Sequence, residues 1–423
     1  MFKSAHKATF LASLGAGLEY YDFIIYGMMA GYLSQLFFAS DLAWIALLKA
    51  FGVFAIGYLA RPFGGIVFGM IGDTFGRKKT FQTVMVLMAI STFCIGLLPT
   101  YAQIGTTASC LLVLLRLVQG LSFGAELPGA LTVVCEYAKK QNHGSYFGFV
   151  FSSVCLGSAL ASLVLFLLSS TIEQTQIMQW GWRIPFLLGG GLAIANYYIR
   201  KNLQETPEFL REQKDQPARS IKKPFHTLLQ RYRIDLLLGI GMTTLIASLV
   251  IFALYMPTYL SVYFGYAPSD IYLATTWALL WLVLMMPVCG WIADRIGKVR
   301  VMVAASLFFG ASILVFINLV NEGGLYSLIG FMLIYQTLQA LLTVSCYPIL
   351  VAHFPVEVRY TGFAICYNVT YSLMGGLPIV MTGLIEFTQM PLSAIFVLIC
   401  CALLSAICVI LLSKRSVAQS IVA

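Results

Sequence analysis

Two carboxylates inside an apolar segment are the residues whose chemistry most needs an explanation. Glu19 and Asp22 stand in the stretch GAGLEYYDFIIYG (15–27), within an apolar run from about 9 to 38. Their i, i+3 spacing puts both on one face of a helix. A charged side chain at the centre of a bilayer costs roughly 2.5–3.5 kcal/mol by insertion scales. We therefore expect both to face a polar cavity, where they bind and release protons, or to form a structural ion pair inside a helix bundle.

Arg61, Arg116 and Glu126 also lie in apolar segments and belong to the same group. Arginine stays charged and acts as a fixed counter-ion. A carboxylate whose arginine contact changes between two conformations can bind a proton in one and release it in the other. The expected roles are Asp22 as principal proton carrier, Glu19 and Glu126 as its partners, and Arg61 and Arg116 as modulators. A permanent ion-pair network of Arg61, Arg116 and Glu126 is the structural alternative.

The composition excludes an ordinary soluble protein. Of the 423 residues, 60% are hydrophobic and 10% are charged, and the mean hydropathy is +0.87; soluble domains carry about 25% charged residues. Apolar runs of 18 or more residues recur along the chain, each long enough for one membrane-spanning helix. No segment has the alternating strands of a membrane barrel. These features predict an all-α polytopic membrane protein.

The apolar runs predict twelve transmembrane helices in two pseudo-symmetric six-helix bundles. One long polar stretch divides them, so we expect an N-terminal bundle at 1–200, a cytoplasmic linker at 201–233 and a C-terminal bundle at 234–423. The predicted spans are 9–37, 43–71, 80–98, 107–137, 144–170, 183–200, 234–264, 271–293, 300–320, 325–352, 360–387 and 391–413.

The residues behind the net charge of +9 are distributed unevenly between the predicted loops of the two membrane sides. With twelve spans, 22 of the 26 Lys and Arg residues fall in or beside the termini and the loops of one side, whereas the opposite loops carry almost only acids. Basic loops stay in the cytoplasm, so both termini are expected there. The basic excess reflects topology and anionic lipid, not nucleic acid. The 10 cysteines show no metal-ligand spacing, and no metal site is expected.

This topology gives the ionisable residues a depth. Counted from the cytoplasmic end of each span, Glu19, Asp22, Arg61 and Glu126 lie roughly 16–22 Å along their helices, and Arg116 about 33 Å. They can meet only if the first, second and fourth spans are neighbours.

An internal repeat supports the division into halves. GMIGDTFGRKK (69–79) and GWIADRIGKVR (290–300) place Gly, Asp, Gly and basic residues in one register, 221 residues apart. The glycines allow close helix packing, and the Asp suits the N-terminus of a neighbouring helix, where the dipole favours an anion. We expect a role in conformational gating for Gly69, Asp73, Gly76, Arg77, Asp294, Gly297 and Lys298.

These paired loops resemble the signature of the major facilitator superfamily of secondary transporters. Further segments are similar to its metabolite:proton symporter branch, which includes proline/betaine, α-ketoglutarate, citrate and shikimate carriers: EYYDF (19–23), RPFG (61–64), RLVQG (116–120), WRIPF (182–186), ETPEF (205–209), MPTYL (256–260) and VRYTG (358–362). The resemblance implies the major facilitator fold, with spans one, two and four adjacent, and a protein that commonly works as a monomer. The chain departs from the branch at 123–126, where FGAE replaces paired glycines before the Glu. Osmosensing betaine carriers often end in a long coiled-coil tail, and since none is seen in this sequence, an osmoregulatory role is not expected.

The second half offers mainly uncharged donors, acceptors and rings. A substrate at the midplane can supply partners for such groups, although aromatic residues at helical spacing equally suit packing or an interface belt. Arginines on one wall and amide or aromatic groups on the other suit a small anion or zwitterion. The substrate-binding candidates are Tyr26, Arg116, Tyr255, Tyr259, Trp277, Trp281, Gln336, Gln339, Tyr367 and Asn368.

We therefore expect proton-coupled import of a small organic acid or zwitterion by alternating access in a bacterial inner membrane. The proton gradient drives it, and no cofactor is expected. No nucleotide-binding loop, and no nucleophile with a plausible base, supports an enzyme. The alternatives are a proton-driven efflux antiporter of a drug or siderophore, and a non-transporting receptor or scaffold with the same fold.

Overall fold

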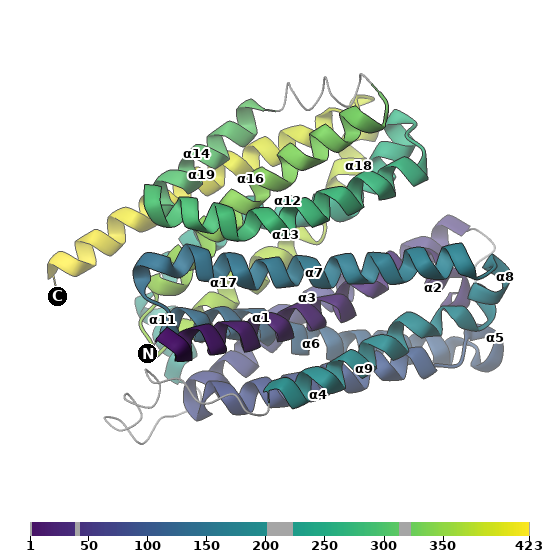
Figure 1. The fold of residues 1–423 in the computed structure, drawn as a ribbon, viewed down its shortest axis with the longest axis horizontal. Coiled ribbons are helices and arrows are strands. Elements are labelled where there is room, and N and C mark those ends of the chain that lie inside the picture. The colour runs from purple at the N-terminus through teal and green to yellow at the C-terminus, as the bar shows by residue number, and fades with distance from the viewer. Residues whose placement is uncertain (1, 39–42, 201–222, 313–322, 423) are drawn as a thin grey trace. The chain divides into compact units, whose positions relative to one another are not determined.

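The computed structural model describes residues 2–38, 43–200, 223–312 and 323–422, which form helices and no strand (Figure 1). The chain divides into two compact units: residues 1–137 with 153–222, and residues 138–152 with 223–423. We call them unit 1 and unit 2. The structure thus groups the start of one long helix, α7 (His143–Thr171), with unit 2 and its remainder with unit 1. Residues 201–222 of the predicted linker lie outside the described residues.

Unit 1 is built around α6, which packs on α1, α3 and α4, while α9 packs on α1 and α4. Its elements besides α7 are α1 (Phe2–Met28), α2 (Ala30–Phe37), α3 (Ala43–Phe75), α4 (Arg77–Leu97), α5 (Tyr101–Ile104), α6 (Thr106–Tyr137), α8 (Gln174–Gln176), the π-helical turn η2 (Ile177–Gly181) and α9 (Arg183–Arg200).

Unit 2 has two packed sets, α12 with α17 and α19, and α16 with α13 and α14. Its elements are the 3₁₀ turn η1 (Lys140–Asn142), α11 (Lys223–Arg231), α12 (Arg233–Phe264), α13 (Pro268–Ile296), α14 (Lys298–Ala311), α16 (Leu325–His353), α17 (Arg359–Met374), α18 (Leu377–Thr388) and α19 (Ser393–Val422).

The helices follow the predicted spans closely, with two corrections. The first span is two helices, α1 and α2, which meet at Met29, where ψ is 2°. The eleventh span is also two helices, α17 and α18, separated at Gly375 and Gly376. Pro378 follows this break, and it cannot donate a backbone hydrogen bond to the preceding turn. The end of the predicted ninth span, after Ser312, lies outside the described residues.

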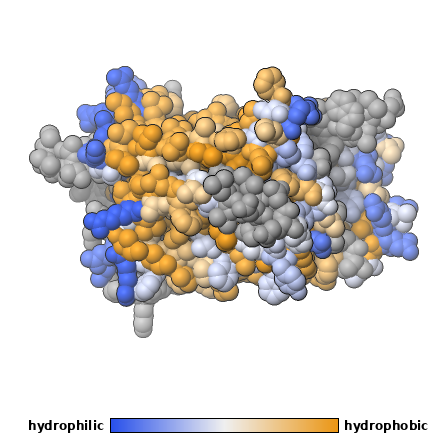
Figure 2. Space-filling view, turned by 90° about the horizontal axis from the view of Figure 1, so that it is seen from above, coloured by the Kyte–Doolittle hydropathy of each residue, from blue (hydrophilic) through white to orange (hydrophobic). Residues whose placement is uncertain are grey.

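The helix surfaces are apolar where a soluble protein would be polar. On α3, Leu59, Phe63 and Val67 are 55%, 67% and 48% exposed, while Arg61 on the opposite face is buried. On the face seen in Figure 2, hydrophobic residues fill a broad middle zone and hydrophilic ones lie mainly toward its two ends. Within the described residues, nine helical stretches are long and apolar enough to cross a membrane. Polar groups inside and apolar groups outside are what a bilayer requires.

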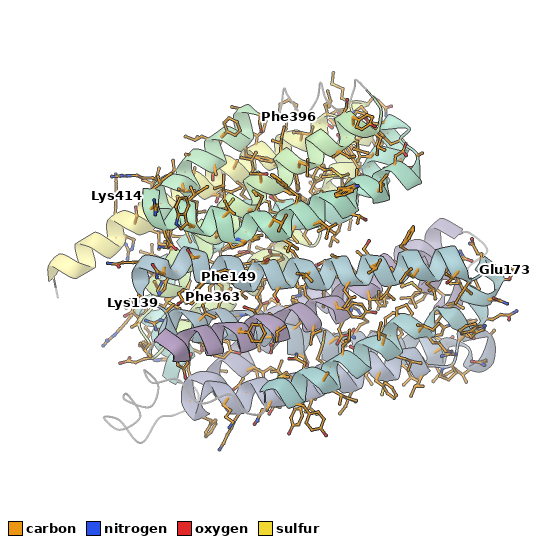
Figure 3. All side chains as sticks on the ribbon, viewed as in Figure 1. Lys139, Phe149, Glu173, Phe363, Phe396 and Lys414 are labelled. Carbon is orange, nitrogen blue, oxygen red and sulfur yellow. The ribbon has the colours of Figure 1, made fainter. Side chains whose placement is uncertain are left out.

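The two ends of helix α7 carry the charges that are expected on opposite sides of the membrane. Lys139 precedes it and Glu173 follows it, so the two charges lie at its opposite ends (Figure 3). This order agrees with the basic and acidic loops on which the predicted topology depends.

Close packing of α3 on α6 depends on glycine. A Cβ added to Gly64 would collide with the backbone of Leu121, and one added to Gly124 would collide with the carbonyl oxygen of Arg61. Small residues let two membrane helices approach until their backbones touch. The same contact brings the α3 residue Arg61 against α6.

Unit 2 contains a buried acid between three helices. Asp235, at the start of α12, is fully buried, and its Oδ1 accepts hydrogen bonds from His353 Nε2 of α16 (3.1 Å) and Arg415 Nε of α19 (3.0 Å). A buried carboxylate is tolerated only with such partners. The cluster therefore joins the ends of α12, α16 and α19.

Replacing Gly124 by Ala should lower the melting temperature of the purified protein, because overpacking a close contact costs about 1–3 kcal/mol. Gly52→Ala on α3 is the matched control, since no atom lies within 4 Å of the position of its Cβ. Thermal unfolding in detergent measures both variants. Equal melting temperatures would show that α3 and α6 need not pack this closely.

Asp235→Ala should also destabilise the protein, because it leaves two basic side chains without their acceptor. The expected loss is about 3 kcal/mol, the low end for a buried ion pair, since Arg415 is partly exposed. Lys414→Ala, on the exposed side of α19 (Figure 3), should leave unfolding unchanged. A melting temperature for Asp235→Ala equal to that of Lys414→Ala would contradict a stabilising role.

Candidate functional site

Asp22 lies inside unit 1 with 1% of its surface exposed. Its carboxylate is enclosed by Thr92 of α4 and Gly189 of α9, where an added Cβ would collide with Oδ1. Neither carboxylate oxygen has a hydrogen-bond partner among the described residues. A buried charge without a partner is costly, and binding one proton removes that charge. The site is therefore suited to a carboxyl group that changes its protonation.

The two predicted arginines come together in a cluster of aromatic rings. The Arg61 Cζ lies 4.0 Å from the Phe23 ring centroid, 3.9 Å from that of Tyr58 and 4.3 Å from that of Phe123. Aromatic ring faces attract a guanidinium by cation–π interaction, more strongly where water is excluded. We call Arg61, Arg116, Phe23, Tyr26, Phe54, Tyr58 and Phe123 the guanidinium–aromatic cluster.

Arg116 enters this cluster from α6. Its Cζ is 4.9 Å from the same Phe23 ring and 4.1 Å from that of Tyr26. It is fully buried, yet only its Nη1 makes a hydrogen bond, a 2.8 Å contact with Gln119 Oε1. Within the described residues, its Nε and Nη2 have no hydrogen-bond acceptor. These N–H groups are available to a carboxylate oxygen of a substrate.

Of the ionisable groups predicted to converge, the structure brings the two arginines together. Arg61 and Arg116 share the Phe23 ring, so spans one, two and four are neighbours as predicted. Asp22 reaches Arg116 through intervening side chains instead of a direct ion pair: Gln119 Nε2 donates to Thr92 Oγ1 over 2.8 Å, and Thr92 adjoins Asp22. Glu126 is buried on α6. Glu19 is on α1, and its side chain is outside the described part of the chain.

Tyr26 is buried within the guanidinium–aromatic cluster. Its hydroxyl donates to the Ala50 carbonyl over 3.3 Å, and its ring stacks on Phe54 at an interplanar angle of 9°. The ring thus holds one face toward Arg116. This places Tyr26 where a ligand of Arg116 would bind.

In unit 2 the predicted polar candidates on α16 are buried and incompletely bonded. Gln336 and Gln339 are 7% and 8% exposed, and their Oε1 atoms have no hydrogen-bond partner among the described residues. Further along α16, Tyr347 contacts the Tyr371 hydroxyl (3.2 Å). An amide oxygen in such a setting suits an N–H or O–H donor of a substrate.

The α17 candidates form an aromatic group with Tyr347. Tyr367 lies 4.5 Å from Tyr371 and 5.7 Å from Tyr347 between ring centroids. Asn368 is fully buried and donates to the Ala364 carbonyl of its own helix. The sequence analysis named Tyr367 and Asn368 and missed Tyr347, which follows the two glutamines on α16 at helical spacing.

Tyr255 and Tyr259 already have intramolecular partners. The Tyr255 hydroxyl is 2.8 Å from Thr382 Oγ1, and the Tyr259 hydroxyl donates to the Pro391 carbonyl (2.9 Å). Tyr259 also lines a small apolar cavity of about 30 Å³ with Phe252 and Tyr335. A cavity of that size holds about one water, so it cannot take a metabolite.

Trp277 and Trp281 do not join these buried polar groups. They are 56% and 36% exposed, on an apolar side of α13 that also carries Leu284 and Trp291. Trp281 Nε1 donates a hydrogen bond to Thr337 Oγ1 (2.8 Å). The Trp281 side chain also lines a groove with Arg300 and other residues of α13, α14 and α16. Both tryptophans are thus more exposed than Gln336 and Gln339, and their role in substrate binding stays a prediction. Helical spacing alone could not tell which face of α13 was buried.

The repeated loops have the same backbone geometry in both units. Gly76 between α3 and α4 has φ 107°, and Gly297 between α13 and α14 has φ 106°, a region that favours glycine. Gly69 and Asp73 are buried at the end of α3. The Arg77 side chain lies outside the described part of the structure.

Asp294 caps the start of α7. Its two oxygens accept hydrogen bonds from Gly144 N, Ser145 N and Ser145 Oγ, each 2.8 Å long, and Lys298 Nζ lies 2.7 Å from Oδ1. An anion at a helix N-terminus is favoured by the free N–H groups and the helix dipole. The expected Asp–helix interaction is therefore present in unit 2, and its partner helix is α7.

Two matches to known families cover most of the chain. Residues 8–226 match "Sugar (and other) transporter", and residues 236–421 match "Major Facilitator Superfamily". A solved structure of the proton:xylose symporter XylE superimposes with a TM-score of 0.80 over 96% of this chain and 95% of its own, at 17% identity. This likeness confirms the predicted twelve-helix fold.

Curated relatives are similar over nearly the full length. The proline/betaine transporter of Salmonella typhimurium is 33% identical, with 90% of this chain and 78% of the relative covered. The citrate-proton symporter of Klebsiella pneumoniae is 31% identical, covering 88% and 84%. The inner membrane metabolite transport protein YhjE of Escherichia coli is 34% identical, covering 88% and 86%. The chain belongs to the major facilitator superfamily of membrane transporters, in its branch of metabolite:proton symporters.

Proposed function

We propose that this protein is a proton-coupled symporter that imports a small metabolite across a bacterial inner membrane by alternating access. The observation that carries this proposal is Asp22, an enclosed carboxyl group that has no hydrogen-bond partner among the described residues, in the same unit as Arg116, a buried arginine with two nitrogens that lack an acceptor there. The relatives of this protein include a proline/betaine transporter and a citrate-proton symporter. The protein works as a monomer in the bilayer, without a cofactor, on the energy of the proton gradient.

The substrate carries a carboxylate. Proline, betaine and citrate differ in size and net charge, but all three have this group. Arg116 supports the assignment, because two of its nitrogens lack an acceptor within the described residues and the adjoining rings exclude water. A small organic acid or zwitterion satisfies this requirement.

Asp22→Asn should abolish uphill accumulation and preserve substrate exchange, because an amide cannot bind and release the proton. The measurement is uptake of L-proline, glycine betaine, citrate and α-ketoglutarate into proteoliposomes under an imposed pH gradient, followed by counterflow without one. Asp270→Asn, at the first turn of α13, is the control and should accumulate substrate normally.

Two results would contradict this proposal. Loss of counterflow together with accumulation would make Asp22 a substrate ligand or a structural residue. Exit of a preloaded compound when the outer pH is lowered, with no uptake of any tested substrate, would instead indicate proton-driven efflux.

We also propose that Asp294 acts in conformational gating. It accepts three hydrogen bonds from residues 144 and 145, at the start of the helix that runs from unit 2 into unit 1. Asp294→Asn places an NH₂ group where an acceptor is needed. Counterflow should slow about tenfold or more, since one charge-assisted hydrogen bond is worth ~1.5–3 kcal/mol, while the substrate concentration at half-maximal rate stays nearly constant. Ser145→Ala, which removes one of the three bonds, should slow it less. An unchanged rate for Asp294→Asn would exclude a gating role.

A further inference from the structure

A continuous line of buried side chains leads from Arg116 to Asp22. Arg116 Nη1 donates to Gln119 Oε1 over 2.8 Å, and Gln119 Nε2 donates to Thr92 Oγ1 over 2.8 Å. Arg116, Gln119 and Thr92 are each fully buried, and Asp22 is 1% exposed. The residues come from α6, α4 and α1, so tertiary packing within unit 1 assembles them.

Arg116 sets the direction of the hydrogen bonds along this line of side chains. A guanidinium has only donors, so the Gln119 carbonyl oxygen must face Arg116 and its NH₂ group must face Thr92. Thr92 therefore accepts with its oxygen and keeps its own O–H proton for another acceptor. Among the described residues no backbone carbonyl takes that proton. The neighbouring acceptor is the Asp22 carboxylate, with which Thr92 interacts, although neither carboxylate oxygen has a formed hydrogen bond within the described structure. A hydroxyl that donates toward Asp22 favours the deprotonated form, because a carboxylate is the stronger acceptor.

Among the described side chains, few others face Asp22. Tyr21 is next to it on α1, but the Tyr21 hydroxyl donates to the Pro185 carbonyl (2.9 Å). From α9 the neighbour is Gly189, which has no side chain, and from α4 it is Thr92. Arg116 of α6 is linked to Asp22 through Gln119 and Thr92. Thr92 is thus the side chain through which Asp22 can sense the state of Arg116.

We propose that Gln119 and Thr92 are positioning residues that couple substrate binding at Arg116 to protonation of Asp22. This rests on the proposed function above. When a substrate carboxylate accepts from Arg116 Nη2 and also from Nη1, it displaces Gln119 Oε1 from Nη1, and the Gln119 amide can turn. Its carbonyl oxygen then accepts the hydrogen bond from the Thr92 hydroxyl, so this hydroxyl no longer donates toward Asp22 and its oxygen can accept from Asp22. One proton from the solution adds to the Asp22 carboxylate, and the resulting O–H group donates a hydrogen bond to Thr92 Oγ1.

The reverse order follows by linkage. If a proton on Asp22 favours substrate at Arg116, substrate favours the proton by the same factor. Release of the substrate returns the Arg116 N–H to Gln119, the amide turns back, and Thr92 again presents its proton to Asp22. The Thr92 hydroxyl stabilises the carboxylate more than the protonated carboxyl group, so the Asp22 proton returns to the solution. Gln119 and Thr92 would thereby make empty or fully loaded states more favourable than half-loaded ones.

The test counts protons taken up per substrate bound. Purified protein in weakly buffered detergent solution receives L-proline, glycine betaine or citrate, whichever binds the unchanged protein, with binding measured by equilibrium dialysis and proton uptake by a pH-indicator dye. Thr92→Val keeps the shape and removes the hydroxyl, and Gln119→Leu removes both amide groups. Each should lower the uptake per bound substrate about fivefold or more, the low end of typical coupling between sites.

Thr92→Ser is the matched control, because it keeps the hydroxyl and should take up protons as the unchanged protein does. Asp22→Asn should take up none at this site. Because proton uptake is divided by the amount of bound substrate, a partly unfolded variant is not mistaken for an uncoupled one. If Thr92→Val and Gln119→Leu bind less substrate but take up as many protons for each molecule bound, the two residues are only structural and the proposal is overturned. If the unchanged protein binds substrate with no proton uptake, proton symport itself fails, which is a distinguishable result.

Discussion

The constraint that orders unit 1 is the cost of placing two guanidinium groups in an apolar helix bundle. Both charges are fully enclosed, and they share one phenyl ring, that of Phe23, with Cζ–centroid distances of 4.0 and 4.9 Å. Two like charges this close repel one another. Ring faces on several sides supply negative potential that offsets both the repulsion and the lost hydration. The aromatic residues of α1, α3 and α6 are therefore part of the electrostatics of the site and not only of its packing.

That cluster can form only where the backbones are close. The short side chains of α3 and α6 let Arg61 and Arg116 reach the same ring. Gly189 does the same for Asp22, because any side chain there would occupy the place of the carboxylate. Glycine at these positions lowers the intrinsic helix propensity, but it leaves space for the neighbouring backbone or side chain. The polar groups are in this way held by a rigid frame, which a site that discriminates small substrates requires.

The two units divide the chemistry differently. Unit 1 holds charges deep among its helices, whereas unit 2 has neutral amides, hydroxyls and rings there, such as Gln336, Gln339 and Tyr367. The acids described in unit 2 lie at helix ends: Asp235 in a cluster with His353 and Arg415, and Asp294 at the start of α7. The buried charges and the buried neutral polar groups are thus largely separated between the two halves of the chain.

The amino-acid sequence by itself determined the helical fold, the span positions and which ionisable residues lie within the spans, because hydrophobic runs and the charges within them reflect the bilayer directly. Only the tertiary structure decided how those groups are connected. Asp22 reaches Arg116 through Gln119 and Thr92, whose side chains are ordinary in sequence and gain meaning from α4 packing on α6. The same holds for Trp277 and Trp281, which have the spacing of Tyr255 and Tyr259 but point out of unit 2. Period and composition specify a helix and its depth, whereas the direction of each side chain is fixed by the helices that pack against it.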